Sequence, residues 1–307
     1  MDFVTIGDNK FFHTIDFSAR QIKRFYPDSK LYIYDWGFTA EQAKKLSDNG
    51  NTEVIDWKDK LKFEDVRERF LNIELEANFD HKKDWKYYVK RYVLNDADFV
   101  ATREKRIENR ARREYLLCQK PKCFLDCAKY IKNGITFLDG DAFLVNKIDE
   151  LLEEDFDIGV TLRRAGEIER AKVMNVIRNL NSGVIFFKLD SRRMQIFIER
   201  WLKLIEERND SLLEQTALDI LVQEIGDNIY DKLYNTGYLE LDKEQRVKIK
   251  ILPCEKYNYN WVESGYDIKN NKILHLKSGR MSKNRYIRRL KKELMLQDKG
   301  ITDVFSK

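Results

Sequence analysis

Residues 134 to 145 read GITFLDGDAFLV, and this stretch decides the fold. Its first half is an apolar run with the length and composition of a buried β-strand, and the run ends at Asp139. One glycine follows, then Asp141, and the chain becomes apolar again. Two carboxylates so close together resist joint ionisation unless a cation compensates them. The stretch therefore predicts a strand end that holds something positively charged.

Similar apolar runs recur along the chain, and helix-like segments separate most of them. The expected strands are DFVTI (2–6), KLYIYD (30–35), TEVID (52–56), ITFLD (135–139), FDIGVTL (156–162), GVIFFKL (183–189), VKIKIL (247–252) and KILHL (272–276). The segment TAEQAKKLSDNG (39–50) has a threonine cap and a glycine stop, and residues 191–209 carry a helical apolar stripe. Strand alternating with helix favours an α/β domain with a mostly parallel, covered central sheet.

Composition limits the class of protein. The chain has 307 residues, 43% of them hydrophobic, which is enough for one large domain, and its three prolines argue against long disordered linkers. No apolar run approaches the roughly 20 residues of a membrane-spanning helix, and the start MDFVTIGDNKFF is typical of a strand rather than a signal peptide. We therefore expect a soluble, cytoplasmic protein. The spacing of the four cysteines indicates buried, reduced thiols rather than a zinc site.

The net charge of +5 belongs to the C-terminal tail. Residues 281–307 hold eight Lys/Arg and three Asp/Glu, so the remainder of the chain is neutral, which argues against a nucleic-acid partner. In the tail, Ile287, Leu290 and Leu294 share one helical face among basic residues. Such a helix either contacts an anionic membrane surface peripherally or packs on the domain. We expect one domain over residues 1–280, followed by this basic helical tail.

The paired aspartates suit a hard cation. Open α/β sheets bind ligands at the carboxyl ends of their strands, and Gly140 permits a tight turn and the close approach of a ligand. Mg²⁺ and Mn²⁺ prefer oxygen ligands, and they often take one or two carboxylates together with substrate phosphates. The alternative is a solvated Asp-Gly turn that only joins two elements.

Three later motifs favour a binding site. Asn181-Ser182-Gly183 precedes an expected strand, and Glu214-Gln215 opens a helix. His275 lies in a strand, where it is either a core residue or a ligand. The Lys277, Gly279 and Arg280 that follow it would form a flexible cationic clamp for phosphate.

In the order of these features the chain, from Asp2 to Arg280, resembles nucleotide-sugar-dependent glycosyltransferases of the A fold type, in particular the glycogenin and lipopolysaccharide galactosyltransferase group. The likeness rests on VTIGDNKFF, in which Asp-Asn follows the first strand, and on YIYDWGFTAEQAKKL, the basic CQKPKCFLDCAKY, the Asp-x-Asp, the Asn-x-Gly, the acid-Gln pair and the late histidine. It implies a single Rossmann-like nucleotide-diphospho-sugar transferase domain. It also implies transfer of a sugar from a nucleoside-diphosphate donor, with UDP expected, to a glycan or lipid-linked acceptor.

The resemblance also implies roles for individual residues. Asp139, Asp141 and His275 would bind Mn²⁺ or Mg²⁺, which bridges the donor diphosphate. The other implied donor and acceptor contacts come from Thr5, Ile6, Asp8 and Asn9 around the nucleoside, from Lys120 or Lys122, from Gly140 beside the ligand, from Lys277, Gly279 and Arg280 on the diphosphate, and from Asn181 on sugar or acceptor hydroxyls. Glu214 or Gln215 would lie beneath the anomeric carbon.

The closing motif departs from the family pattern. It is His-x-x-x-Gly-Arg here, without the usual Pro-Trp, which leaves the choice between Lys277 and Arg280 open. The group retains anomeric configuration, so retention is expected, although Glu214 could serve as the base of an inverting enzyme.

Two other functions stay open on the sequence. The first is a haloacid-dehalogenase-type phosphatase with Asp139 as nucleophile and Asp141 as acid/base, although Phe143 stands where that family has Thr or Val. The second is a domain that binds a nucleotide sugar or glycan without turnover.

Overall fold

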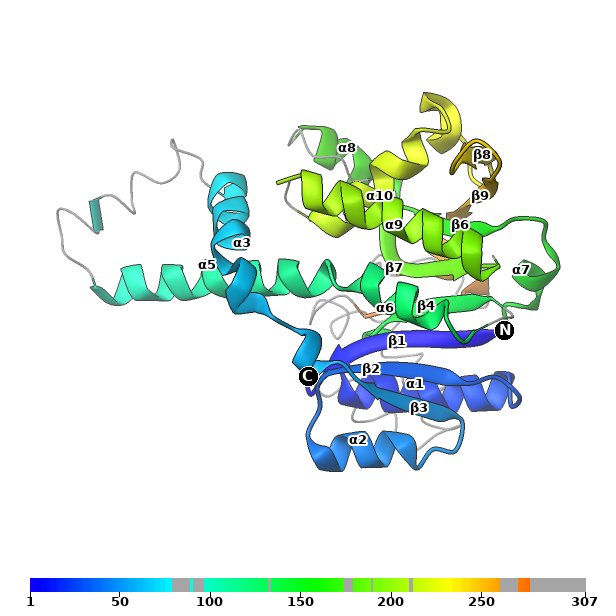
Figure 1. Cartoon of the computed structure of the whole chain (residues 1–307), viewed down its shortest axis with the longest axis horizontal. Coiled ribbons are helices and arrows are strands. Elements are labelled where there is room, and N and C mark those ends of the chain that lie inside the picture. Colours follow the sequence, from blue (N-terminus) through cyan, green and yellow to red (C-terminus); the bar gives the residue numbers. More distant parts are fainter. Residues whose placement is uncertain are drawn as a thin grey trace.

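The computed structural model describes residues 1–78, 89–90, 97–131, 134–173, 179–188, 190–209, 212–259 and 270–276. At its centre lies an eight-stranded sheet in the order β3-β2-β1-β4-β7-β6-β9-β8 (Figure 1). These strands are β1 (Asp2–Asp8), β2 (Leu31–Gly37), β3 (Thr52–Asp56), β4 (Ile135–Asp139), β6 (Ile158–Leu162), β7 (Leu180–Phe187), β8 (Thr236–Glu240) and β9 (Arg246–Pro253). A second, two-stranded sheet joins β5 (Ala142–Leu144) to β10 (Ile273–His275). The predicted tail (281–307) lies outside the described residues.

The central sheet is mixed and mostly parallel, which confirms the predicted fold class. Parallel pairs join β1 to β2, β2 to β3, β1 to β4 and β6 to β9, whereas β7 runs antiparallel to both its neighbours and β8 runs antiparallel to β9. The strand order reverses at β1, which pairs with β2 on one side and β4 on the other. Ile6 lies opposite Asp139 in this pairing. The two strands therefore end together at a switch point, where open α/β sheets bind their ligands.

Helices cover both faces of the sheet because successive strand side chains alternate between them. The helices are α1 (Phe12–Phe25), α2 (Ala40–Ser47), α3 (Phe63–Asn78), α5 (Ala97–Leu117), α6 (Lys120–Cys127), α7 (Asp149–Glu153), α8 (Ala165–Val173), α9 (Ser191–Glu207), α10 (Leu213–Gln223) and α11 (Cys254–Tyr257). On one face Phe3 packs with Ile15 of α1; on the other, Val4 belongs to the cluster that contains Phe124 of α6 and Trp201 of α9.

The helices expected at 39–50 and 191–209 are confirmed. Thr39 caps α2 through a reciprocal capping box, because its hydroxyl accepts from the Gln42 backbone N–H (3.2 Å) and the Gln42 side chain accepts from the Thr39 N–H (3.0 Å). Asp190 caps α9 by accepting the Arg193 backbone N–H (3.0 Å). All four cysteines are buried and form no disulfide, as predicted.

Three strand predictions were incomplete. The short β5 and the exposed β8 were not predicted, and β7 begins at Leu180, so that Asn181 lies inside the strand rather than before it. The cause at β7 is its central position, where backbone groups must find partners on both sides. For β5, three residues carry too little pattern, and the strand exists because β10 pairs with it.

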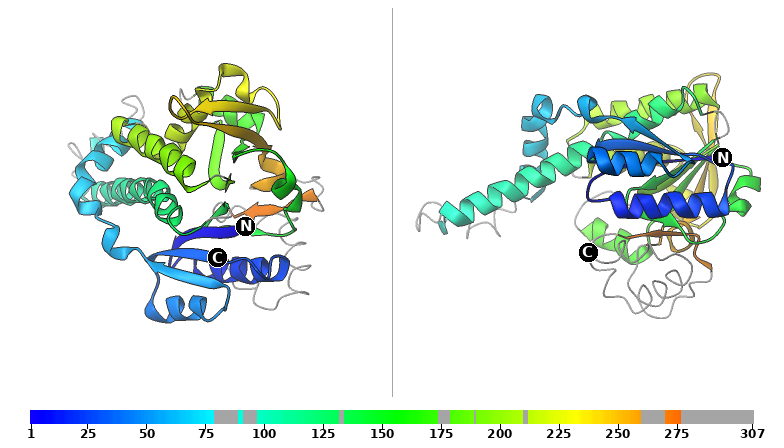
Figure 2. Two further views of the ribbon diagram at one scale, coloured as in Figure 1. Left: turned by 45° about the vertical axis from the view of Figure 1, so that its right-hand side comes forward. Right: turned by 90° about the horizontal axis from the view of Figure 1, so that it is seen from below.

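Beyond the sheet, α3 and α5 form a projecting pair that leaves the body beside the carboxyl ends of β1 and β4 (Figures 1 and 2). Arg67 of α3 binds Glu108 of α5 through two hydrogen bonds of 2.9 and 2.7 Å, and Tyr115 packs on Phe63 and Phe70. We call this pair the arm. Across the described residues, no helix, in the arm or elsewhere, is both long and apolar enough to cross a membrane.

The helix α10 is attached to β7 by a fully buried carboxylate. Asp219 accepts the backbone N–H groups of Asn179 (2.6 Å) and Leu180 (3.0 Å), and also the Asn179 side-chain amide (3.2 Å). A buried carboxylate that accepts several N–H groups compensates its own burial and theirs. The attachment positions the first turn of α10, which carries Glu214 and Gln215.

Replacing this carboxylate tests the attachment. We expect Asp219→Ala to lower the free energy of unfolding by about 3 kcal/mol, because two buried backbone N–H groups lose their acceptor. Asp242→Ala is the matched control, since Asp242 also accepts two backbone N–H groups (both 2.8 Å) but is exposed, and its loss should cost below about 1 kcal/mol. Urea denaturation measures both, and equal losses would refute the attachment.

Candidate active site

The loop after β4 places both aspartates at the switch point. Ile135 to Leu138 are buried, and Asp139 is the first residue of the strand that reaches solvent. A Cβ on Gly140 would lie 2.6 Å from the Ile6 carbonyl oxygen and 3.1 Å from Phe11, so only glycine fits between the two strands. The chain can therefore turn sharply and present Asp141 beside Asp139.

The two-stranded sheet brings His275 to this loop. In the antiparallel pairing of β10 with β5, His275 lies opposite Ala142, and the Leu276 N–H donates to the Asp141 carbonyl (2.7 Å). Backbone hydrogen bonds with Tyr259 hold the other edge of β10. A histidine distant in sequence is thus fixed next to the aspartates by backbone pairing.

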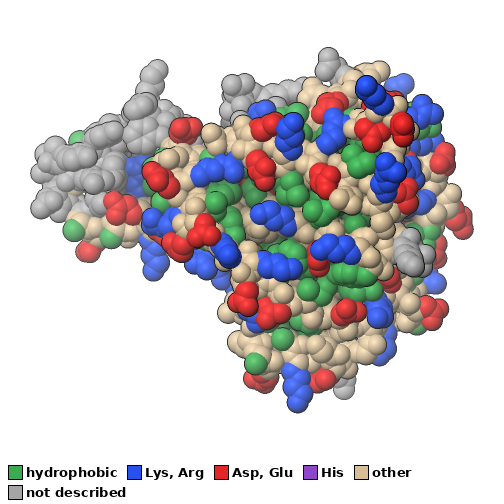
Figure 3. Space-filling model, in the orientation of Figure 1, with side chains coloured by type: hydrophobic (Ala, Val, Ile, Leu, Met, Phe, Trp, Pro, Cys, Tyr) green, Lys and Arg blue, Asp and Glu red, His purple; other side chains and the backbone are tan. Residues whose placement is uncertain are grey.

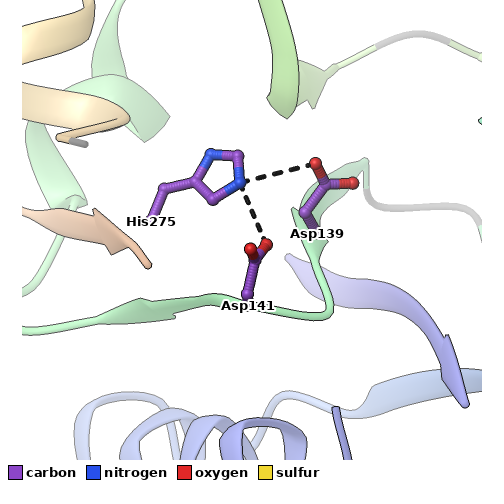
Figure 4. A group of neighbouring side chains, drawn as sticks. All are labelled: Asp139, Asp141 and His275. Carbon is purple, nitrogen blue, oxygen red and sulfur yellow. Dashed lines mark ion pairs between the residues drawn. The ribbon is translucent and has the colours of Figure 1, made fainter. Parts of the chain in front are cut away.

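The three side chains form a compact set of metal-ligand atoms (Figure 4). The Nε2 atom of His275 lies 3.0 Å from Asp141 Oδ1 and 3.6 Å from Asp139 Oδ2, and the ligand atoms of all three residues lie within 4.8 Å of one another. His275 is 3% exposed, whereas both carboxylates are half-buried. Two carboxylates and one imidazole are a donor set that fits a divalent cation.

Hydrogen bonds on the side of the His275 imidazole away from the aspartates determine which ring nitrogen faces Asp139 and Asp141. His275 Nδ1 lies 2.8 Å from Asn258 Oδ1, and the amide nitrogen of Asn258 donates to Thr161 Oγ1 (2.8 Å) and the Asn181 carbonyl (3.2 Å). Because these acceptors fix the orientation of the amide, its oxygen accepts the Nδ1 proton. Nε2 is then the ring nitrogen that faces the aspartates, and it is the one that would bind a metal.

The electrostatics keep Asp141 ionised. Burial alone would raise the pKa of Asp141, but the attraction of His275 and the hydrogen bond between them outweigh burial and lower the pKa. The carboxylate is therefore available as an anionic ligand at neutral pH.

A fully buried lysine compensates the neighbouring carboxylates. Lys120 is 1% exposed, and its Nζ lies 2.7 Å from Asp139 Oδ1 and 4.0 Å from Glu214 Oε2. Burial opposes its charge, but attraction to Asp139 and Glu214 prevails, so the pKa of Lys120 is raised. Of the two predicted lysines, Lys120 therefore lies in the site, whereas Lys122 is exposed on the same helix.

Glu214 lies next to Lys120. Its Oε2 accepts from the Ser182 hydroxyl (2.9 Å), while Oε1 is buried and has no hydrogen-bond partner among the described residues. Burial, strengthened by repulsion from Asp139, outweighs the attraction of Lys120 and raises the pKa of Glu214 to about 7. A carboxyl with this pKa is close to half-protonated at neutral pH.

The adjacent Gln215 is held by an arginine that was not predicted. Arg163 donates to Gln215 Oε1 (2.8 Å) and to the Leu180 carbonyl (2.8 Å). The amide nitrogen of Gln215 is buried without a hydrogen-bond partner among the described residues. Asn181 is also buried, and its Oδ1 accepts from the Gly183 N–H (3.2 Å).

These groups line one cavity of about 430 Å³. Of the predicted site residues, it is lined by Ile6, Asp8, Lys120, Asp139, Gly140, Asp141, Asn181, Glu214, Gln215 and His275. Thr5, Asn9 and Lys122 are not part of its wall: Thr5 is buried in β1, and Asn9 is exposed. Lys277, Gly279 and Arg280 lie outside the described residues.

Sequence inspection missed Arg163, Ser182 and Asn258. Arg163 could have been found, because it directly follows an expected strand that runs in the same direction as β4. Ser182 belongs to the Asn181-Ser182-Gly183 motif, but the motif alone does not indicate that its hydroxyl binds Glu214. No local signal marks Asn258, since its partners Thr161 and His275 come from distant segments.

Gly183 makes the close approach of His275 possible. A Cβ at this position would lie 2.2 Å from His275 Cε1 and 2.9 Å from Asp139 Oδ2, and buried β7 cannot retreat. We expect Gly183→Ala to weaken Mn²⁺ binding by about tenfold or more, because the ring must leave its position. Titration with Mn²⁺ measures this, and Gly166→Ala is the control, since nothing lies within 4 Å of a Cβ there. Wild-type affinity in a folded Gly183→Ala protein would contradict the proposed ligand set.

The raised pKa of Glu214 predicts a pH-dependent stability. The unfolded chain releases this proton at about 4.5 and the folded chain at about 7, so raising the pH through this window favours unfolding by about 3 kcal/mol. Glu214→Gln should remove this loss, whereas Glu240→Gln, at an exposed position, should keep it. Denaturation with a chelator present at about pH 4.5 and about pH 7 measures the difference. The same pH dependence in all three proteins would refute the raised pKa.

No model of a protein family matches the sequence, and a search of curated proteins found no match. Among solved structures, the chain is similar to the galactosyltransferase LgtC in complex with donor and acceptor sugar analogues, at 18% identity over 71% of this chain and 69% of that one, with a TM-score of 0.41. An active-site mutant of LgtC is 13% identical, over 97% of this chain and 96% of its own (TM-score 0.48). Mouse xyloside xylosyltransferase 1 in its apo form is 12% identical, over 91% and 98% (TM-score 0.42). All are glycosyltransferases by name, but at these identities and TM-scores the likeness carries no weight for function, which must be inferred from the side chains of the site.

Proposed function

We propose that this chain is a metal-dependent glycosyltransferase, which moves a sugar from a nucleoside-diphosphate donor, UDP in our proposal, to a glycan or lipid-linked acceptor. The observation that carries the proposal is the set formed by Asp139, Asp141 and His275 at a sheet switch point. Its imidazole Nε2 faces two carboxylates at 3.0 and 3.6 Å inside a cavity of ligand size. Mn²⁺ or Mg²⁺ held there would neutralise charge on the diphosphate leaving group.

The chain's own cations supply further support. Lys120 and Arg163 both line the cavity, and each is held in place by polar partners. A diphosphate carries negative charge that these groups can offset without moving, because the buried site has already fixed them. Asp8, at the end of β1, lies at the same edge and suits the nucleoside side of the donor.

Transfer breaks the bond between the anomeric carbon and the diphosphate oxygen and forms a bond to the acceptor oxygen, whose proton passes to the departing diphosphate. We propose retention of configuration. Glu214 turns its carboxylate toward Ser182 and Lys120 and is 1% exposed, so it suits charge balance better than the role of a base open to an acceptor. Gln215, which Arg163 orients, is our choice for the residue beneath the anomeric carbon.

The phosphatase alternative fits the cavity less well. Phe143 occupies the position where that family has Thr or Val, and here the ring is fully buried and packs edge-on against Phe17 (4.9 Å). A nucleophilic Asp139 would also have to act while paired with Lys120. A domain that binds the donor without turnover would share all the contacts described above, and only an activity measurement separates it from an enzyme.

Donor binding is the first test. At about one hundred times Kd, a bound UDP-sugar stabilises the fold by about 2.7 kcal/mol, which should raise Tm by roughly 5 °C in the presence of Mn²⁺. We expect no such rise with chelator, or in Asp141→Asn, because the metal-ligand set is then incomplete. A thermal-shift screen of nucleotide sugars measures this, with Asp231→Asn as the exposed control variant.

If no nucleotide sugar shifts the wild type under any metal condition, the proposal fails and phosphorylated substrates come next. Stabilisation without release of nucleoside diphosphate on addition of sugar acceptors would identify a binding module. Release with inversion at the anomeric carbon would overturn the assignment of Glu214 and Gln215.

A further inference from the structure

Arg163 brings a cation into the cavity on the side of Gln215. It directly follows β6, its side chain is 12% exposed, and it lines the cavity, whereas Lys120 pairs with Asp139 at the metal-ligand set. On the face of the molecule seen in Figure 3, the described Lys and Arg side chains lie interspersed with Asp and Glu, so this face offers an anion no surface of one sign. A cation held inside the cavity is therefore a place where an anionic ligand can be selected.

The hydrogen-bond acceptors around Arg163 already have donors. Arg163 itself donates to the Leu180 carbonyl and to Gln215 Oε1, both at 2.8 Å. The Gly183 N–H donates to Asn181 Oδ1 (3.2 Å). These bonds fix the orientation of both side-chain amides, so each oxygen is held by the protein and each nitrogen is left for another partner.

The donors of the same three cavity-lining residues are not used up. The Gln215 amide nitrogen is buried without a hydrogen-bond partner among the described residues, and that of Asn181 reaches Cys254 Sγ at 3.8 Å. Of the five N–H groups of a guanidinium, two of Arg163 make hydrogen bonds within the part of the chain that the structure describes. We call Arg163, Asn181 and Gln215 the donor corner. A buried donor without an acceptor is costly, so a ligand group that supplies acceptors is favoured there.

A carboxylate fits the donor corner better than a hydroxyl or a phosphate does. A hydroxyl brings a proton to a place where the acceptors already have donors, whereas a carboxylate only accepts and matches the paired N–H groups of a guanidinium. Glu167 lies 3.5 Å from Arg163 and offsets part of its charge, so one further negative charge is balanced better than the roughly two of a phosphate ester. Glu214 does not compete for Arg163, because its Oε2 faces Ser182 and Lys120.

We propose that the donor corner binds the carboxylate of a hexuronic acid, carried by the transferred sugar or by the acceptor sugar. This inference rests on the proposed glycosyltransferase function and specifies its substrate. Gln215 is the residue proposed to lie beneath the anomeric carbon, and Arg163 donates to it. In a hexuronic acid, the anomeric carbon and the carbon that bears the carboxyl group flank the same ring oxygen. A sugar placed over Gln215 therefore brings its carboxylate within reach of Arg163.

The first measurement compares two donors on the wild-type full chain. UDP-glucuronate and UDP-glucose differ only in the oxidation of one carbon, and the corresponding galactose pair differs in the same way. With Mn²⁺ present, we expect one acidic donor to bind about tenfold more tightly than its neutral counterpart, because the carboxylate gains charged hydrogen bonds. Isothermal titration calorimetry measures both Kd values. Tighter binding of UDP-N-acetylglucosamine than of either acidic donor would overturn the inference in favour of an amide-bearing sugar.

Variants assign the preference to Arg163. In Arg163→Gln the acidic and the neutral donor should bind equally, while Arg163→Lys should keep part of the preference because it keeps the charge but lacks the planar fork. Arg246→Gln is the matched control, since Arg246 is exposed and stacks on Tyr238, and it should keep the full preference. A rise in Tm with the neutral donor shows that each variant is folded. A full preference in Arg163→Gln would refute the role of Arg163.

A second arm tests the acceptor. If the acceptor carries the acid, methyl glucuronide should bind more tightly than methyl glucoside to the protein loaded with Mn²⁺ and UDP, and Arg163→Gln should lose that difference. Equal binding of acidic and neutral sugars in both arms overturns the inference, while donor stabilisation leaves the proposed function standing. If no nucleotide sugar binds under any metal condition, the proposed function fails and this inference fails with it.

Discussion

The site depends on holding three carboxylates close together at the edge of a packed core. Asp139, Asp141 and Glu214 surround a single buried ammonium, that of Lys120, and the first two also face His275. A buried lysine is costly unless its charge is matched, and clustered carboxylates are costly for the same reason. Each group is therefore tolerable only because the others are present. The geometry of the cavity follows from this mutual compensation.

Several helices and strands, rather than one sequence motif, bring these charged groups together. The end of β4 and the turn after it supply the two aspartates, α6 supplies Lys120, and α10 supplies Glu214. Asp219 attaches α10 to the start of β7, and Trp201 of α9 donates its indole N–H to the Glu214 carbonyl (2.8 Å). The first turn of α10 is thus held from two sides, so the acid-Gln pair stays fixed relative to the aspartates.

The local sequence pattern was sufficient to predict much of the fold and of the candidate site. The buried strand ending at Asp139 is marked by its apolar run, and the α2 cap by Thr39 and Gln42, because these signals act over a few residues. Only the three-dimensional structure could show that Lys120, and not Lys122, lies in the site, because both are on one helix and differ only in burial. The proximity of Asn258 to His275 and the clash that excludes a side chain at Gly183 arise from long-range packing, which no local pattern encodes.

The pairing of β5 with β10 has a consequence for how the protein is made. Synthesis proceeds from the N-terminus, so the aspartates, Lys120 and the acid-Gln pair leave the ribosome long before His275 does. An unfinished chain already contains Lys120 and Asp139, which pair in the complete protein, but it lacks the imidazole of the Asp139, Asp141 and His275 set. If the proposed metal binds there, its loading would have to wait for synthesis of β10, which supplies His275.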